Sequence, residues 1–172
     1  VYDDFTITDK SDYTADSPYY RYIINKSYVY INGVGTQKHI TCSIPNTAND
    51  SETNSYEAIA MLHTSGLRNL HVSMKNGRYA IHADSIDANA TQYYKNCIFE
   101  HLGNQEVIDY RIANSQAYNN VFSGVDGFGC GTNSGVKMYF DNTEFKGIKG
   151  GFIHNNNSFS VAHYMQFNRS KF

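Results

Sequence analysis

The chain has 172 residues, of which 41% are hydrophobic and 17% charged, and its formal net charge is −2. Such a length fits one domain, and the charge gives no reason to expect nucleic acid, whose phosphates require clustered Lys and Arg. No apolar run approaches the roughly 20 residues that a membrane-spanning helix needs, so we expect no membrane partner. Because the sequence starts at Val1, we expect it to be a piece of a longer protein.

The first 20 residues are acidic and rich in Tyr, and we expect them to form a connecting arm or the end of a preceding module. Residues 21–172 predict one β domain, because short alternating runs such as 28–31 and 39–42 are typical of strands. Asn-Gly pairs at 32–33 and 76–77 predict bends, and the polar segment 46–55 predicts a projecting loop. Helical periodicity never persists for more than about two turns, so the domain is predicted to be all-β.

Four asparagines, Asn69, Asn96, Asn120 and Asn142, each precede a bulky apolar residue by one to three positions, and they are spaced 27, 24 and 22 residues apart. A period in this range, built from strand-like pieces, is typical of a solenoid. Asparagine tolerates the left-handed conformation at a tight corner, and its amide can hydrogen-bond to its own stacked copies. The sequence therefore predicts a right-handed parallel β-helix with these four asparagines stacked at one corner.

Alternation along the strands predicts which side chains fill the interior of this β-helix. The cysteines lack the spacing of metal ligands, and Cys97 is expected to be a buried, unpaired thiol that packs as a small hydrophobe. We expect no metal and no cofactor. The buried set is predicted to include Leu70, Val72, Met74, Tyr79, Ile81, Cys97, Phe99, Ile108, Val121, Phe145 and Ile153.

Three polar residues, His82, Asp109 and His154, each follow one of the inward isoleucines and are expected to project outward along one strip. In one interpretation, Asp109 on the adjacent coil orients the imidazole of His82 as a general base. In a second, the strip binds sugars, and in a third it is an ordinary solvated face. No carboxylate cluster of the kind expected for a glycosidase pair or a calcium site is visible. The sugar-binding interpretation comprises Arg78, Tyr79, His82, Asp84, Asp109, His154 and Asn155.

The chain is rich in aromatic residues, with 15 Tyr and 10 Phe. Tyrosine offers a flat apolar ring with a polar tip, which suits both sugar faces and protein interfaces. Alternate members of each tyrosine run must face the interior, so their number alone does not locate a site.

The runs GRYAIHAD at 77–84 and YYKNCIFEHLGN at 93–104 resemble the pectate-lyase-like β-helix segments of bacteriophage tail fibre and tailspike proteins. Residues 129–135 and 152–156 resemble the next coils, and 28–35 resembles the first full coil of the wider superfamily. The resemblance covers roughly residues 20–160. It implies a homotrimer on the virion surface that contacts other tail proteins and binds a host polysaccharide on its coil faces or between subunits.

The leading hypothesis is thus a virion-surface module, extracellular on a phage tail, that recognises a host glycan. One alternative is a polysaccharide depolymerase on the same fold, either a lyase or a glycoside hydrolase. The chain does not match the aspartate-containing catalytic motifs of pectin esterases or the calcium-binding aspartates of pectate lyases, which favours binding over catalysis. A second alternative is a purely structural shaft segment.

Overall fold

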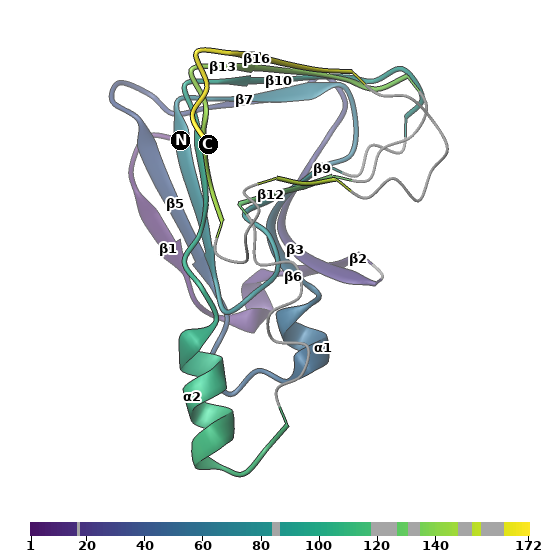
Figure 1. The fold of residues 1–172 in the computed structure, drawn as a ribbon. Helices are drawn as coiled ribbons and strands as arrows, with labels where there is room; N and C mark the ends of the chain where they lie inside the picture. Colours follow the sequence, from purple (N-terminus) through teal and green to yellow (C-terminus); the bar gives the residue numbers. More distant parts are fainter. Residues whose placement is uncertain (17, 84–86, 118–126, 131–134, 148–152, 156–163) are drawn as a thin grey trace.

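The described strands form three sheets, which lie around a common interior (Figure 1). The protein is represented by a computed structural model, which describes residues 1–16, 18–83, 87–117, 127–130, 135–147, 153–155 and 164–172, with only the backbone of residues 50 and 153–155. All described strand pairs are parallel except the antiparallel hairpin of β2 (Thr14–Asp16) and β3 (Tyr19–Asn25). The predicted all-β class is confirmed.

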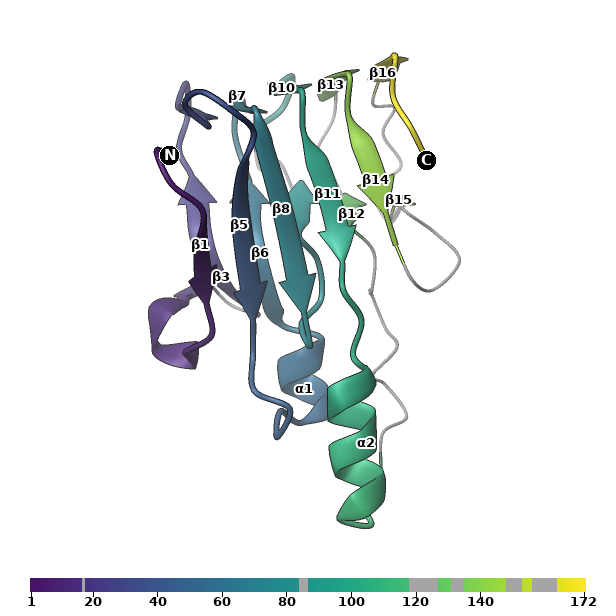
Figure 2. The same ribbon diagram turned by 90° about the vertical axis from the view of Figure 1, so that its left-hand side faces the viewer.

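We name the three sheets A, B and C, and their strands are given below. From β4 (Tyr30–Asn32) onward the chain passes through them in a constant order, first sheet C, then sheet A, then sheet B. Each strand inside a sheet therefore pairs with the strand of the preceding round and with that of the next (Figure 2). Sheet A contains β1 (Phe5–Ile7), β5 (Lys38–Ser43), β8 (Leu70–Lys75), β11 (Ile98–His101) and β14 (Glu144–Lys146). Sheet B contains β2 (Thr14–Asp16), β3 (Tyr19–Asn25), β6 (Tyr56–Met61), β9 (Ile81–Ala83), β12 (Phe128–Cys130) and β15 (Ile153–Asn155). Sheet C contains β4 (Tyr30–Asn32), β7 (Ser65–Arg68), β10 (Thr91–Lys95), β13 (Lys137–Asp141) and β16 (Tyr164–Asn168).

The short helices lie in the connections between strands. A 3₁₀ turn, η1 (Lys10–Asp12), precedes β2, and α1 (Asp50–Thr53) lies within the segment 46–55 that was expected to be a loop. The longer α2 (Gln105–Ala113) follows β11 and projects from the lower end of the sheets (Figures 1 and 2). The N-terminal 20 residues, expected to be an arm or the end of another module, supply β1 at one edge of sheet A and the hairpin strand β2.

The core is formed by rows of stacked apolar side chains from the three sheets. In sheet A, Val72 pairs in register with Phe99, which in turn pairs with Phe145. In sheet C, the ring of Tyr94 stacks on Phe140 with centroids 4.8 Å apart and planes 9° apart. These stacks follow directly from the parallel register, since like positions repeat at the strand spacing of about 4.8 Å. Burial is confirmed for Leu70, Val72, Met74, Ile81, Cys97, Phe99, Ile108 and Phe145.

Two members of the predicted core cannot be assigned in this way, and two others are placed differently. Val121 lies outside the described residues, and of Ile153 only the backbone is described. Ile108 is buried on α2, where it forms a separate small cluster with Val107. Tyr79 is buried too, but on the opposite side of sheet B from the core, as described below.

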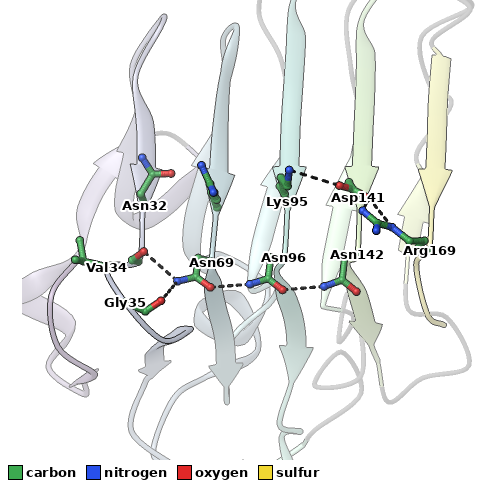
Figure 3. Close-up of a pocket in the computed structure, with 11 residues that line it drawn as sticks. Asn32, Val34, Gly35, Asn69, Lys95, Asn96, Asp141, Asn142 and Arg169 are labelled. Carbon is green, nitrogen blue, oxygen red and sulfur yellow. Dashed lines mark hydrogen bonds and ion pairs between the residues drawn. The ribbon is translucent and has the colours of Figure 1, made fainter.

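The predicted asparagine corner is present for three of the four residues (Figure 3). Asn69, Asn96 and Asn142 have φ of 58°, 55° and 49°. Asn96 Nδ2 donates to Asn69 Oδ1 at 2.6 Å, and Asn142 Nδ2 donates to Asn96 Oδ1 at 2.8 Å. Gly33 precedes Asn69 in this row, and a Cβ at Gly33 would lie only 2.1 Å from the Asn69 carbonyl oxygen. We call the three asparagines the asparagine ladder.

Asn120, the fourth expected member of the ladder, lies outside the described residues. Asn142 bonds directly to Asn96, so no further asparagine stands between them. The reason is the insertion of α2, which lengthens this round of the chain to 46 residues.

Candidate functional site

Two groups of polar and aromatic side chains lie on the sheet faces that point away from the core. The buried cluster belongs to sheet B and comprises Tyr19, Arg21, Glu57, Arg78, Tyr79 and His82. The tyrosine face belongs to sheet C and comprises Tyr30, Arg68, Tyr93, Lys95, Lys137, Tyr139, Asp141 and Tyr164, together with Arg169, which directly follows β16.

The buried cluster is centred on Glu57, which is fully buried on β6. Arg21 is its direct neighbour across the β3–β6 pair, and Arg21 Nε donates to Glu57 Oε2 at 3.1 Å. On the other side, Nδ1 of His82 lies 2.5 Å from Glu57 Oε1. One carboxylate thus sits between a guanidinium and an imidazole from the strands on either side, the arrangement in which a buried charge is compensated.

Aromatic rings enclose this ionic group. The ring of Tyr19 meets the His82 ring edge-on, with centroids 5.0 Å apart. The guanidinium of Arg78 lies over both Tyr19 and Tyr79, at 5.0 and 4.9 Å from the ring centroids. Such cation–π contacts stabilise a positive charge where water is excluded. Because Glu57 is fully buried and His82 only 4% exposed, neither group is directly accessible to a polymeric substrate.

Gly129 explains how Tyr79 fits on this side of sheet B. Gly129 lies between Phe128 and Cys130, which point into the core, so its missing side chain would point away from the core. A Cβ at Gly129 would lie 2.6 Å from the Tyr79 ring. The prediction that Tyr79 points into the interior is therefore wrong, and its ring covers Gly129 instead.

The structure brings together only some of the residues that the sequence placed on one outer strip. Arg78, Tyr79 and His82 lie in the buried cluster. Asp84 lies outside the described residues, and of His154 and Asn155 only the backbone in β15 is described. Asp109 lies on α2, where its Oδ1 accepts a hydrogen bond from Gln105 at 2.8 Å.

Two expectations about this strip are therefore wrong. His82 and Asp109 do not occupy adjacent strands, because residues 105–113 form a helix, and the residue paired with His82 on the next strand is Gly129. His82 is also not solvated, since Tyr19 and Tyr79 cover it. The pairing of His82 Nδ1 is with Glu57, a residue that the sequence pattern did not single out.

The tyrosine face carries a continuous row of rings across sheet C. Centroid distances are 6.5 Å from Tyr30 to Tyr93, 5.3 Å from Tyr93 to Tyr139 and 5.8 Å from Tyr139 to Tyr164. Tyr30, Tyr93 and Tyr164 are 50%, 45% and 50% exposed. Gly66 makes the row continuous, because its missing side chain leaves room for the Tyr30 ring, which would lie 2.7 Å from a Cβ there.

A row of polar residues runs beside the rings, two positions after Tyr30, Tyr93 and Tyr139 on their strands. Register places Asn32, Arg68, Lys95, Asp141 and Asn168 next to one another in that order. Between this row and the asparagine ladder lies an open groove of about 690 Å³ (Figure 3). The groove runs across the strands, parallel to the row of tyrosines.

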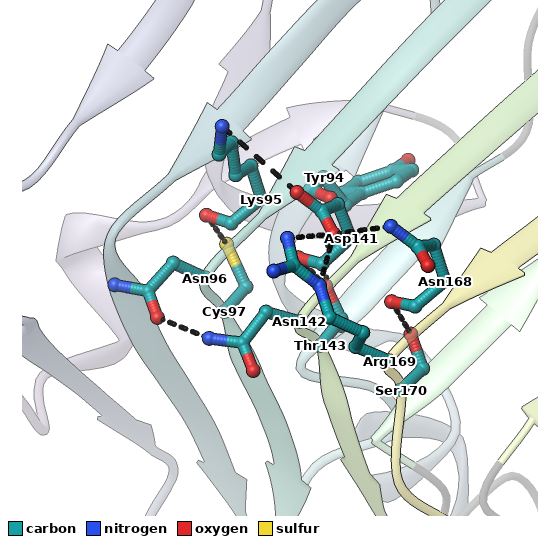
Figure 4. Close-up of polar contacts among 10 residues, drawn as sticks. All are labelled: Tyr94, Lys95, Asn96, Cys97, Asp141, Asn142, Thr143, Asn168, Arg169 and Ser170. Carbon is teal, nitrogen blue, oxygen red and sulfur yellow. Dashed lines mark hydrogen bonds and ion pairs between the residues drawn. The ribbon is translucent and has the colours of Figure 1, made fainter.

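Asp141 organises the C-terminal part of this row (Figure 4). Arg169 Nη2 donates to Asp141 Oδ1 at 2.7 Å, and Asn168 Nδ2 donates to the same oxygen at 2.9 Å. The hydrogen bonds from Arg169 lower the pKa of the Asp141 carboxyl, which therefore stays ionised. Lys95 Nζ is more distant, 3.9 Å from Asp141 Oδ2, and the Lys95 side chain is 58% exposed.

The sequence contains a signal for the tyrosine face in the spacing between the tyrosines and the corner residues. Tyr93 and Tyr139 each lie three positions before a ladder asparagine, and Tyr30 lies three positions before Gly33. The same offset from Asn69 leads to Gly66, the residue that makes room for Tyr30. A recurring offset from the corner residue thus marks the row.

Comparisons with protein-family models, with curated proteins and with solved structures find no match to this chain. Among the described helices, none is long and apolar enough to cross a membrane. In the described part of the chain, no group of three or more His, Cys, Asp or Glu side chains could hold a metal ion.

Proposed function

We propose that the chain is a right-handed parallel β-helix that recognises a host cell-surface glycan as part of a phage tail fibre or tailspike. The rotation of the chain through three parallel sheets and the asparagine ladder support the β-helix. The phage setting, the homotrimer and the contacts with other tail proteins rest on the resemblance of the sequence to such modules.

The observation that carries the glycan-binding proposal is the exposed row of tyrosines beside a polar groove. Tyrosine presents a flat apolar ring that suits a sugar face and a hydroxyl that can hydrogen-bond to sugar. Each ring of the row is anchored on a strand, so binding orders few flexible groups and loses little entropy. Arg68, Lys95 and Asn32 supply hydrogen-bond donors along one side of the rings.

The depolymerase alternative has weaker support in the geometry. Its candidate base, His82, is paired with a carboxylate, as an enzyme would require, but that carboxylate is Glu57 and both groups are buried. The tyrosine face offers no described imidazole, and its one carboxylate, Asp141, is held ionised by Arg169. Binding without cleavage is therefore the function that we propose.

Incubation with capsular and cell-wall polysaccharides tests the proposal. We expect the protein to retain a glycan without shortening it. New reducing ends would mean hydrolysis, and absorbance from an unsaturated sugar would mean elimination; either would favour the depolymerase. If no glycan is retained, the structural shaft segment is the remaining hypothesis.

A matched pair of tyrosine variants locates the site. Tyr93→Ala should reduce glycan retention at least tenfold, because it interrupts the row at its centre. Tyr20→Ala is the control: Tyr20 is 40% exposed and stacks on Tyr56 at 4.7 Å, but it lies on sheet B. Equal losses in the two variants would contradict a site on sheet C.

A further inference from the structure

We infer that the glycan is a linear, acidic polysaccharide that lies across the strands of sheet C, with its rings on the tyrosines and its anionic groups over Arg68 and Lys95. This inference rests on the proposed function and names the class of ligand. It is carried by the charges of the tyrosine face, by their lack of internal compensation and by the spacing of the row.

The tyrosine face is positively charged, although the whole chain has a formal net charge of −2. Arg68, Lys95, Lys137 and Arg169 are basic, whereas Asp141 is the one acidic side chain among the described strand residues that point outward from sheet C. Cations gathered on one face raise the local concentration of a polyanion and steer its approach. The charge therefore favours an acidic ligand over a neutral one.

Arg68 and Lys95 form an uncompensated pair at the centre of this face. They are directly paired in register on β7 and β10. Like charges directly opposite each other destabilise a sheet, and no described residue forms a hydrogen bond or ion pair with the side chain of Arg68. Among the described residues, the Lys95 side chain has only the long contact with Asp141, whose closest partner is Arg169. A bound anion between Arg68 and Lys95 would relieve this repulsion, and Arg could bind a carboxylate through two parallel hydrogen bonds.

The spacing of the row indicates how the polymer lies. Parallel strands stand about 4.8 Å apart, close to the length of one sugar unit in an extended chain. A linear polysaccharide that crosses the strands can thus place one ring over each strand. Since Arg68 and Lys95 follow the aromatic row by two positions, they lie along one edge of such a chain, where acidic substituents of a sugar ring project.

Paired polymers test the inference. The dissociation constant is measured for polygalacturonate, alginate, hyaluronan and polysialic acid, each beside its carboxyl-reduced, neutral form, and for a phosphate-bearing teichoic acid. We expect at least one acidic polymer to bind ten or more times tighter than its neutral form, with an affinity that falls as salt is raised. The teichoic acid distinguishes a phosphate from a carboxylate as the anionic group.

Charge variants assign the effect to the two residues. Arg68→Gln and Lys95→Gln should each weaken binding of the acidic polymer about tenfold and weaken binding of a neutral polymer much less, because Gln removes the charge but keeps a hydrogen-bond donor. Lys75→Gln, which removes a cation from sheet A, should change neither. Equal affinity for acidic and reduced forms, or unaltered binding by both variants, would overturn the inference.

The outcomes separate this inference from the proposed function. If neutral glycans bind and Tyr93→Ala abolishes their binding while the charge variants have no effect, the proposed function stands and the acidic ligand is wrong. If no glycan of either charge binds, both are wrong. Equally tight binding of single-stranded DNA would assign the face to polyanions in general and contradict a glycan-specific site.

Discussion

The buried cluster and the tyrosine face are made of the same kinds of side chain, yet they treat charge in opposite ways. In the buried cluster, Glu57 lies between Arg21 and His82, so each charge has a partner within hydrogen-bonding distance. On the tyrosine face, Arg68 and Lys95 stand side by side with no acid between them. Charges that are compensated internally stabilise a fold, whereas exposed charges without compensation are available to a ligand.

The difference in exposure comes from what covers each sheet. On the outer face of sheet B the rings of Tyr19 and Tyr79 cover the ionic group, and Arg21 is only 4% exposed there. Sheet C has no covering element among the described residues, and Tyr93 is 45% exposed. Similar side chains are therefore enclosed on one sheet and exposed on the other.

The largest effect expected from this comparison is that of Glu57→Ala. Removing the carboxylate leaves His82 without its ionic partner and Arg21 paired with Asp16 alone, which should lower the free energy of unfolding by about 3–5 kcal/mol. Asp141→Ala is the matched change on the tyrosine face and should cost much less, because solvent screens its ion pair with Arg169. Urea denaturation measures both. If Glu57→Ala does not fold, Glu57→Gln gives a smaller loss in the same direction; similar stabilities for the Glu57 and Asp141 variants would contradict the comparison.

Lowering the pH should reduce the stability of the fold without changing glycan binding. His101 is buried, accepts a hydrogen bond from the Gly103 N–H at Nδ1 and lies 3.0 Å from the Gly77 carbonyl at Nε2, so its neutral form is favoured. Burial lowers its pKa to about 4. Because the unfolded chain takes up this proton near pH 6.5 and the folded chain near pH 4, His101 should lower the free energy of unfolding by about 3 kcal/mol as the pH falls through that window.

The test is the slope of stability against pH rather than stability itself. His101→Gln should flatten the slope between pH 6.5 and pH 4, even if the variant is less stable throughout. An unchanged slope would mean that His101 does not carry the effect. Glycan binding should stay nearly constant from pH 7 to pH 5, since no histidine lies on the described tyrosine face.

The asparagine ladder borders the groove, and its variants should have effects on stability of intermediate size. Asn96→Ala loses two amide hydrogen bonds and keeps a left-handed φ of 55°, so it should cost about 2 kcal/mol. Asn96→Gly loses the same hydrogen bonds but tolerates that φ, and should be less destabilising. Thermal unfolding of the two variants compares them. A glycine variant as unstable as the alanine variant would mean that backbone conformation contributes nothing at this corner.

The smallest effect on stability is expected at the binding row. Tyr93→Ala removes one exposed cross-strand aromatic contact and should cost about 1 kcal/mol or less. Tyr79→Ala, which empties a fully enclosed site in the buried cluster, should cost about 3–5 kcal/mol. Denaturation midpoints measured side by side test this order, and its reversal would mean that the two regions had been assigned the wrong roles.

Much of the fold was predictable because its corner depends on a local property. Asn69, Asn96 and Asn142 adopt positive φ and bond to one another, and both features follow from the asparagine side chain. The inward Val72, Phe99 and Phe145 then follow from alternation. Asp109 was misplaced because Ile108 is compatible with an inward strand position and with the buried side of a helix, and only the contacts of α2 decide between them.

The candidate site was less predictable because it depends on relations between rounds of the chain. Strict alternation through residue 79 placed Tyr79 inside, but β9 begins at Ile81, and Ala80 and Ile81 both lie in the core. The side on which the Tyr79 ring lies is decided by Gly129, 50 positions later in the sequence. In the same way, Tyr30 and Tyr93 become neighbours only because β7 carries Gly66 between them.

The direct bond between Asn142 and Asn96 has a consequence for how such a chain can change its length. Strands β11 and β14 pair in register although 46 residues separate the two asparagines, so the corner sets the alignment independently of what is inserted between. Arg111 anchors the inserted α2 through the Ala48 carbonyl at 3.0 Å rather than through either sheet strand. The segment 105–113 is thus a natural position for exchange, where foreign peptides could be displayed at the end of the sheets without shifting the rows of sheet C.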